Sequence, residues 1–243
     1  MPRFFVSPDK VVDGKITIDT DDVGHIMRVL RMNCGDMLTV CDTCGNDYEA
    51  KISDVGDGAI ICDIVTSSKS VSEPKTFVTL FQALPKSPKM EYIIQKTTEL
   101  GISKIVPVKM SRCVMKWGKG DEKKTVRWQK ICESAAKQSG RGIIPEITNP
   151  ITFDEAVKHL SEYELSFAPY ECEETNTLKS VISGRKVKTA AFIIGPEGGF
   201  DPTETEKLKA AGIKTITLGK RILRTETAGE AVLSMMMYEM DEI

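Results

Sequence analysis

The chain has 243 residues, of which 41% are hydrophobic, and a formal net charge of −2, so it can form one large or two modest domains with a sizeable apolar core. It contains no apolar stretch near the length of a membrane span, and its first ten residues lack the apolar core of a secretory signal. These features argue against a membrane or secreted protein and predict a soluble, cytoplasmic one.

The cysteine content is also typical of a protein in the reducing cytoplasm. The cysteines are seven in number, with no spacing typical of a disulfide framework. Cys41 and Cys44 form a single C-x-x-C pair, and the chain has only two histidines, His25 and His159. A closed zinc site needs four such ligands, so we expect no metal.

The N-terminal third has the pattern of a small β-barrel. Short apolar runs alternate with turn residues, as in antiparallel sheets, and predict strands at Arg3–Val6, Lys15–Ile18, Met37–Cys41, Tyr48–Ile52 and Ala59–Val65. A predicted helix, Asp21–Met32, carries Arg28 and Arg31 three residues apart, a spacing that favours a common face able to grip phosphates.

A polar, Ser-rich stretch at Ser67–Lys75 ends in proline and predicts a linker. We therefore expect domains at 1–70 and 76–243. In the second, apolar strands alternate with amphipathic helices, the pattern of a parallel α/β layer. The predicted strands are Phe77–Leu80, Ile105–Val108, Leu165–Ala168, Ala190–Ile194 and Thr215–Leu218.

Two glycine-bearing turns follow the last two of these strands. Gly195, Gly198 and Gly199 occupy the first, and Asp201-Pro202 with Glu204 then reads as the start of a helix. Gly219 breaks the chain after the second, and Thr227 with Glu230 can form a capping box for the last helix. Backbone without side chains can approach a ligand closely, so we expect one small ligand at both turns.

Charge is distributed unevenly along the chain. Residues 86–141 contain fourteen lysines and arginines against five acids, a net charge of +9, whereas residues 154–174 carry −6. A basic region within a neutral protein is typical of a polyanion-binding surface, and we interpret it as an RNA-binding region.

The chain resembles one known family in the motifs GPEGGF and LGKRILRTETA. The similarity extends to MPRFF, HIMRVLR, the ELG at Glu99–Gly101, SRCV, and the stretch from RWQKI to QSGR. These motifs resemble the RsmE family of 16S rRNA uracil-N3 methyltransferases, which belongs to the SPOUT superfamily.

The resemblance implies a SPOUT-type parallel sheet with a C-terminal trefoil knot, preceded by a PUA-like RNA-binding barrel. It further implies a homodimer that methylates N3 of a specific uridine, of the uridine 1498 type, in the 16S rRNA of the small ribosomal subunit. The implied cofactor is S-adenosyl-L-methionine. Its expected site comprises Ile194, Gly195, Pro196, Glu197, Gly198, Gly199, Leu218, Gly219, Ile222, Leu223, Arg224, Thr227 and Ala228.

The chemistry of the implied reaction suggests roles for charged residues. The uracil N3 loses a proton before it accepts a methyl group, and a cation favours the resulting anion. We expect Arg224 to supply that charge and Glu226 or Glu197 to accept the proton. The RNA-binding candidates are Arg3, Arg28, Arg31, Lys86, Lys89, Arg112 and Arg141.

The residues leave alternatives open. A noncatalytic RNA-binding protein of the same fold, or a methyltransferase acting on another RNA, would share these motifs. A hydrolase is disfavoured because the chain has no G-x-S-x-G elbow and few histidines. Arg224 can also serve in a structural pairing with Glu226 or Glu204.

Overall fold

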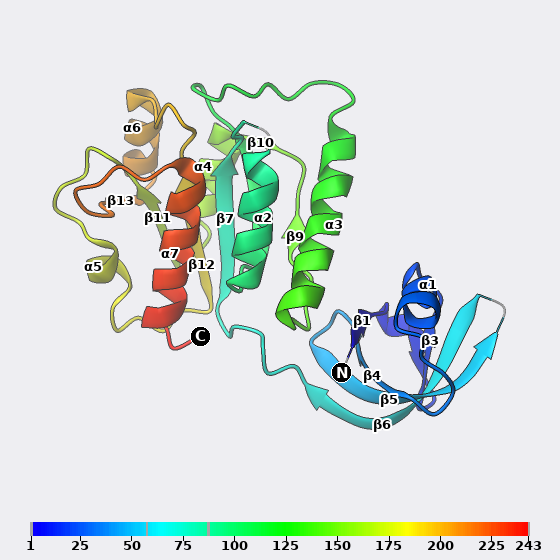
Figure 1. Cartoon of the computed structure of the whole chain (residues 1–243). Helices are drawn as coiled ribbons and strands as arrows, with labels where there is room; N and C mark the ends of the chain where they lie inside the picture. The colour runs from blue at the N-terminus through cyan, green and yellow to red at the C-terminus, as the bar shows by residue number, and fades with distance from the viewer. Residues whose placement is uncertain (1, 57, 87, 243) are drawn as a thin grey trace. The chain divides into compact units, whose positions relative to one another are not determined.

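The computed structural model describes residues 2–56, 58–86 and 88–242, so Met1 of the MPRFF motif lies outside the described residues. The chain forms two compact units. Figure 1 colours the chain by residue number, from blue at the N-terminus to red at the C-terminus. One comprises Met1–Glu73 and Ala136–Ile144, and the other comprises Pro74–Ala135 and Pro145–Ile243.

The first unit is built on a six-stranded sheet in the order β1-β4-β5-β6-β3-β2. The β1–β4 pair is parallel and the others are antiparallel. The strands are β1 (Arg3–Phe5), β2 (Val11–Val12), β3 (Lys15–Ile18), β4 (Met37–Cys41), β5 (Asn46–Gly56) and β6 (Ala59–Lys69). Alternate residues such as Ile16, Ile18 and Leu38 are fully buried, because successive side chains of a strand point to opposite faces.

Two parts of this unit differ from the sequence-based expectation. Strand β6 continues to Lys69, into the predicted linker, because its polar end still pairs with β5, with Asn46 opposite Lys69. The predicted helix Asp21–Met32 is only a short turn, α1 (Asp22–Gly24), followed by a π-helix, η2 (His25–Val29). Arg31 lies beyond it with φ 55°, so Arg28 and Arg31 do not share a helical face.

The second unit is a parallel α/β structure, as predicted. Its strands follow the order β10-β8-β7-β12-β11-β13, with β9 paired to β8. They are β7 (Phe77–Ala83), β8 (Lys104–Lys109), β9 (Glu146–Ile147), β10 (Ile151–Thr152), β11 (Leu165–Pro169), β12 (Thr189–Ile194) and β13 (Lys214–Ile216). The central strands β7 and β12 are almost wholly buried, which explains their continuous apolar runs.

Helices accompany this sheet, with α2 and α7 side by side in Figure 1. The helices are α2 (Lys89–Glu99), α3 (Glu122–Ser139), α4 (Phe153–Leu160), α5 (Leu178–Ile182), α6 (Pro202–Ala210) and α7 (Thr225–Glu239). Residues from Ala136 onward in α3 belong to the first unit. The trefoil knot implied by the family resemblance stays a prediction.

Candidate functional site

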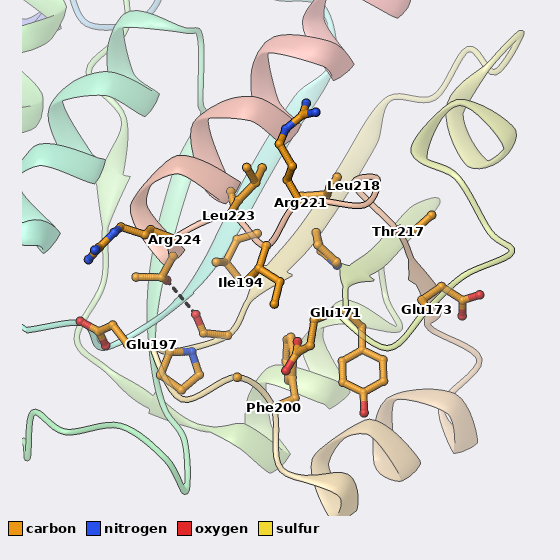
Figure 2. A pocket seen from close by; sticks show the side chains of 18 of the residues that line it. Glu171, Glu173, Ile194, Glu197, Phe200, Thr217, Leu218, Arg221, Leu223 and Arg224 are labelled. Carbon is orange, nitrogen blue, oxygen red and sulfur yellow. Dashed lines mark hydrogen bonds between the residues drawn. The ribbon is translucent and has the colours of Figure 1, made fainter.

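A pocket of about 1070 Å³ opens at the carboxyl ends of β11, β12 and β13. Ligands of open α/β sheets bind at this edge, because loops there meet beyond the strand ends. Figure 2 shows the side chains around it. The pocket is lined by Lys89, Pro169, Tyr170, Glu171, Glu173, Glu174, Ile194–Phe200, Thr217–Thr225 and Ala228.

The first glycine turn forms one wall of this pocket. A Cβ on Gly195 would lie 3.1 Å from the buried ring of Phe200, and a Cβ on Gly198 would lie 3.3 Å from the Cβ of Arg112. Gly199 has φ 68°, a conformation that L-residues rarely adopt, and a Cβ there would overlap the Glu171 carboxylate. A side chain at the first two positions would crowd its neighbours, and at the third the backbone conformation itself favours glycine.

Helix α6 starts after this turn as predicted. Asp201 is its N-cap, Pro202 its first residue, and Glu204 completes the capping box. Glu204 Oε1 also accepts hydrogen bonds from the Ser111 backbone N–H at 2.9 Å and the Ser111 hydroxyl at 3.0 Å. The SRCV motif thus anchors the chain after β8 to the base of the glycine turn.

The second glycine turn leads into α7. Gly219 has φ 100°, which explains why glycine is required there. The predicted capping box of Thr227 with Glu230 is wrong, because the N-cap of α7 is Arg224, three residues earlier, and the helix begins at Thr225. Thr225, the first residue of the helix, donates from its hydroxyl to the Gly195 carbonyl at 2.7 Å and so joins the two turns.

A cluster of three charged residues lies at one side of the pocket. The Lys89 ammonium is 3.0 Å from Glu226 Oε2 and 3.4 Å from Glu197 Oε1. Burial opposes ionisation of Glu197, but N–H groups of Glu197 and Lys86 and the Lys89 charge together lower the pKa of Glu197. The lowered pKa makes the Glu197 carboxylate a weak base, and Lys89 holds Glu226 in an ion pair beside it.

The opposite wall was not foreseen from the sequence. Tyr170, Glu171, Glu173 and Glu174 follow β11, whose strand carries no glycine turn to mark it. Their only signal was the acidic character of residues 154–174. Figure 2 shows Glu171 and Glu173 across the pocket from Arg224 and Glu197.

Glu173 has a structural role within this wall. It accepts from the Thr215 hydroxyl at 2.6 Å, the Thr175 hydroxyl at 2.7 Å, and the N–H groups of Thr175 and Asn176. These bonds, that from Thr215 above all, lower the pKa of Glu173 strongly. The loop after β11 is thereby fixed to β13.

The lowered pKa of Glu173 predicts an acid-dependent loss of stability. The carboxylate stabilises the folded state fully above its ordinary pKa of 4.5, and this contribution disappears as the pH falls from there towards the folded-state pKa. We expect Glu173→Gln to lower Tm near neutral pH, with a difference from the parent that shrinks below about pH 4. Thermal unfolding against pH tests this. Glu174→Gln is the control, and a pH-independent difference would contradict the assignment.

Arg224 and Arg221 are exposed at the rim of the pocket. Among the described residues, neither has a carboxylate within ion-pair distance, so the suggested pairing of Arg224 with Glu226 or Glu204 is absent. Figure 2 shows Arg224 near Glu197 and Arg221 pointing away from them. Arg224 is thus a cation that the fold leaves available to a ligand.

The RNA-binding candidates divide into two groups. Arg28, Arg31 and Lys86 are exposed. Lys89 joins the carboxylate cluster, and Arg112 donates to the Gly198 carbonyl at 3.1 Å and lies 3.4 Å from Asp201.

Arg141 and Arg3 are held inside the first unit. Arg141 is only 3% exposed and pairs with Glu73 at 2.7 Å, so the expectation that it contacts RNA is corrected to a structural role. Arg3 is largely buried and pairs with Asp47 at 2.6 Å.

The residues expected to bind the cofactor lie close together, unlike the RNA-binding candidates. All line the pocket except Thr227, which is exposed on the first turn of α7. Glu226 also stands outside the lining, beside Lys89. Thr225 belongs to the stretch Arg224–Ala228 that the family resemblance implies for the pocket, but its hydroxyl bond to the Gly195 carbonyl has no signal in the sequence.

Two further kinds of functional feature are absent from residues 2–56, 58–86 and 88–242. None of their His, Cys, Asp and Glu side chains come together in threes as metal ligands. None of their helices combines the length and apolar character that a bilayer crossing requires.

Comparison with known proteins places this geometry in context. A family model for an RNA methyltransferase domain matches residues 72–237, and a model for an RNA methyltransferase PUA domain matches residues 18–65. Ribosomal RNA small subunit methyltransferase E of Bacillus subtilis is 32% identical over 98% of this chain and 97% of its own.

Two solved structures are similar over nearly the whole chain. One is a ribosomal RNA small subunit methyltransferase E from Neisseria gonorrhoeae bound to S-adenosyl methionine, with 29% identity and a TM-score of 0.86. The other is a putative methyltransferase from Legionella pneumophila with bound SAM, with 28% identity and a TM-score of 0.85. Each covers 98% of this chain, which covers 97% of each.

Proposed function

Because the chain belongs to the ribosomal RNA small subunit methyltransferase E family, we propose that it methylates N3 of a specific uridine, of the uridine 1498 type, in small-subunit rRNA with S-adenosyl-L-methionine as methyl donor. Residues 1–70 serve in this proposal as an RNA-binding domain and residues 76–243 as the methyltransferase domain. The expected substrate is 16S rRNA, alone or in the small subunit.

The observation that carries the proposal is the pocket between the two glycine turns. Its volume of about 1070 Å³ leaves ample room for a nucleoside-sized ligand, and Ile194, Leu218 and Leu223 give it apolar walls. Glu171 and Glu174 supply negative charge on the opposite wall, which complements a cationic sulfonium. The residues present therefore fit the cofactor, with the glycine turns as the surface against which it packs.

The sulfonium supplies an electrophilic methyl group, so the protein must bring it in line with an activated ring nitrogen. Arg224 provides the free positive charge that favours the N3 anion of uracil. Lys89 pairs with both Glu197 and Glu226, so we assign these two residues to orienting Lys89 and the start of α7. The proton of N3 then leaves to solvent or to a group on the RNA.

Two measurements test the proposed function directly. The purified protein should bind S-adenosylmethionine stoichiometrically in calorimetry. Loss of one N3-methyluridine from the 16S rRNA of a deletion strain, restored by the intact gene, should identify the product. An unchanged rRNA modification pattern would contradict the reaction, and a different methylated nucleotide would contradict the assignment to N3.

The exposed arginines of the first unit predict salt-dependent RNA binding. Reversing Arg28 and Arg31 to glutamate should weaken RNA affinity and reduce the slope of log K against log salt by about 1.5, because two phosphate contacts are lost. Cofactor affinity should not change. Arg185→Glu with Lys186→Glu, on an exposed loop of the second unit, makes the same charge change as a control. Equal losses of RNA affinity in the two double variants would indicate a general effect of charge rather than a specific contact.

A homodimer is proposed from the outer surface of α2 and α7. Tyr92, Met235 and Tyr238 are 47%, 43% and 76% exposed, an apolar group that a second copy of the chain can cover. Light scattering should give a dimeric mass for the parent and a monomeric mass for Met235→Glu with Tyr238→Glu. Val126→Glu on α3, 62% exposed in the parent, is the control. A monomeric parent would contradict the proposal.

A further inference from the structure

A buried glutamine lies in the largely apolar centre of the parallel sheet. Gln82 lies on β7, opposite Ile194 of β12 and Pro107 of β8, and is fully buried. Its amide nitrogen donates to the Ala83 carbonyl at 3.0 Å and to the Thr225 hydroxyl at 2.9 Å. Among the described residues, its carbonyl oxygen has no hydrogen-bond partner.

The direction of these hydrogen bonds follows from the groups involved. A threonine hydroxyl has one proton, and Thr225 donates it to the Gly195 carbonyl, which can only accept. Towards Gln82 the same hydroxyl must therefore accept, which fixes the amide nitrogen of Gln82 on that side. The Gln82 amide thus donates to the Thr225 hydroxyl, which in turn donates to the Gly195 carbonyl. We name these two hydrogen bonds the Gln82 relay.

The relay joins the two turns that form the pocket. Gly195 is the first residue of one turn, and Thr225 directly follows Arg224 at the end of the other. Both line the pocket, whereas Gln82 does not and lies behind Thr225. The place of the Thr225 backbone determines where Arg224, the N-cap of α7, presents its side chain.

A hydrocarbon side chain at position 82 would avoid the cost of burying an amide with one unpaired oxygen. The amide instead holds the Thr225 hydroxyl in one orientation, and such directed bonds specify a geometry more sharply than apolar packing does. The buried amide of Gln82 therefore costs folding free energy, and in return it fixes the position of the Thr225 hydroxyl.

We propose that Gln82 and Thr225 are positioning residues for methyl transfer, which set the separation of the two turns and the place of Arg224. This rests on the proposed function, because it assumes that the pocket holds the cofactor. Gln82 acts only through Thr225, so its contribution requires the Thr225 hydroxyl.

Four variants test the relay. Thr225→Val keeps the shape but removes the hydroxyl, Thr225→Ser keeps the hydroxyl, Gln82→Met removes the amide, and the fourth combines Gln82→Met with Thr225→Val. Thr97→Val is the matched control, since Thr97 is a fully buried threonine on α2 that donates to the Ile93 carbonyl at 2.7 Å and does not line the pocket. For each, Tm, cofactor Kd by calorimetry and the single-turnover rate at saturating cofactor are measured.

We expect Thr225→Val to weaken cofactor binding about tenfold and to slow the saturated single turnover about tenfold, while Thr225→Ser stays near the parent. Gln82→Met should cause a smaller loss in both quantities and add nothing to Thr225→Val in the double variant. Thr97→Val should lower Tm with no change in Kd or rate.

Two outcomes would overturn the relay. One is a folded Thr225→Val protein with the parent's Kd and rate, and the other is fully additive losses in the double variant. Failure of the parent itself to bind S-adenosylmethionine would instead contradict the proposed function.

Discussion

Replacing Arg224 by alanine is expected to slow single-turnover methylation about a hundredfold at saturating cofactor, the effect of removing one group that stabilises developing charge. Arg224 is exposed at the pocket rim and has no ion-pair partner among the described residues, so its charge remains available to the uracil anion. Arg224→Lys should recover only part of the rate, because an ammonium lacks the planar fork of donors. Cofactor affinity should be nearly unchanged.

The pH dependence separates this role from simple binding. Raising the pH should partly rescue the Arg224 variants, because solvent then generates the anion that the arginine no longer favours. Arg185→Ala is the control, because Arg185 is exposed and does not line the pocket. Equal rates in parent and variant would remove Arg224 from the chemistry, and a loss confined to cofactor Kd would make it a binding residue.

Replacing Gly199 by valine should weaken cofactor binding about a hundredfold, equivalent to about 2.7 kcal/mol. Gly199 has φ 68°, where a β-branched residue is strained, and its new side chain would displace the Glu171 carboxylate that lies over the turn. The rearranged turn would no longer present its backbone to the ligand. Calorimetry with S-adenosylmethionine measures the change.

The control must share the backbone strain without touching the pocket. Gly212 has φ 77°, lies in the turn between α6 and β13, and has open space where a Cβ would be. Gly212→Val should lower Tm and leave cofactor Kd unchanged. Comparable losses of affinity in both valine variants would mean that strain alone is responsible. Alanine at both positions repeats the comparison with less strain.

The sheet strands were predictable because their burial leaves a simple pattern in the sequence. Residues 190–194 are fully or nearly fully buried, and a strand covered on both faces is apolar throughout. The short strands β2, β9 and β10 were missed because pairs of residues carry no periodic signal. Strand β6 was predicted too short because its polar end is held by its neighbour's backbone, which sequence patterns do not record.

Features of the candidate site that depend on local sequence could be read from the chain, whereas contacts with distant partners could not. The glycine turns were identified from their own residues. The burial of Arg141 depends on Glu73, and the pairing of Lys89 depends on residues more than a hundred positions away. The start of α7 was placed three residues late because Thr225 makes its bonds to Gly195 and Gln82, outside the local capping pattern.

The pocket has a consequence for how the protein is made. Apart from Lys89, every lining residue lies at or after Pro169, and Arg224 and Thr225 lie at the start of the final helix, α7. Chains emerge from the ribosome N-terminus first, and earlier parts fold before later ones appear. A nascent chain therefore completes most of its sheet before it can hold a ligand, and an interrupted chain lacking α7 would be a partly folded product without a binding site.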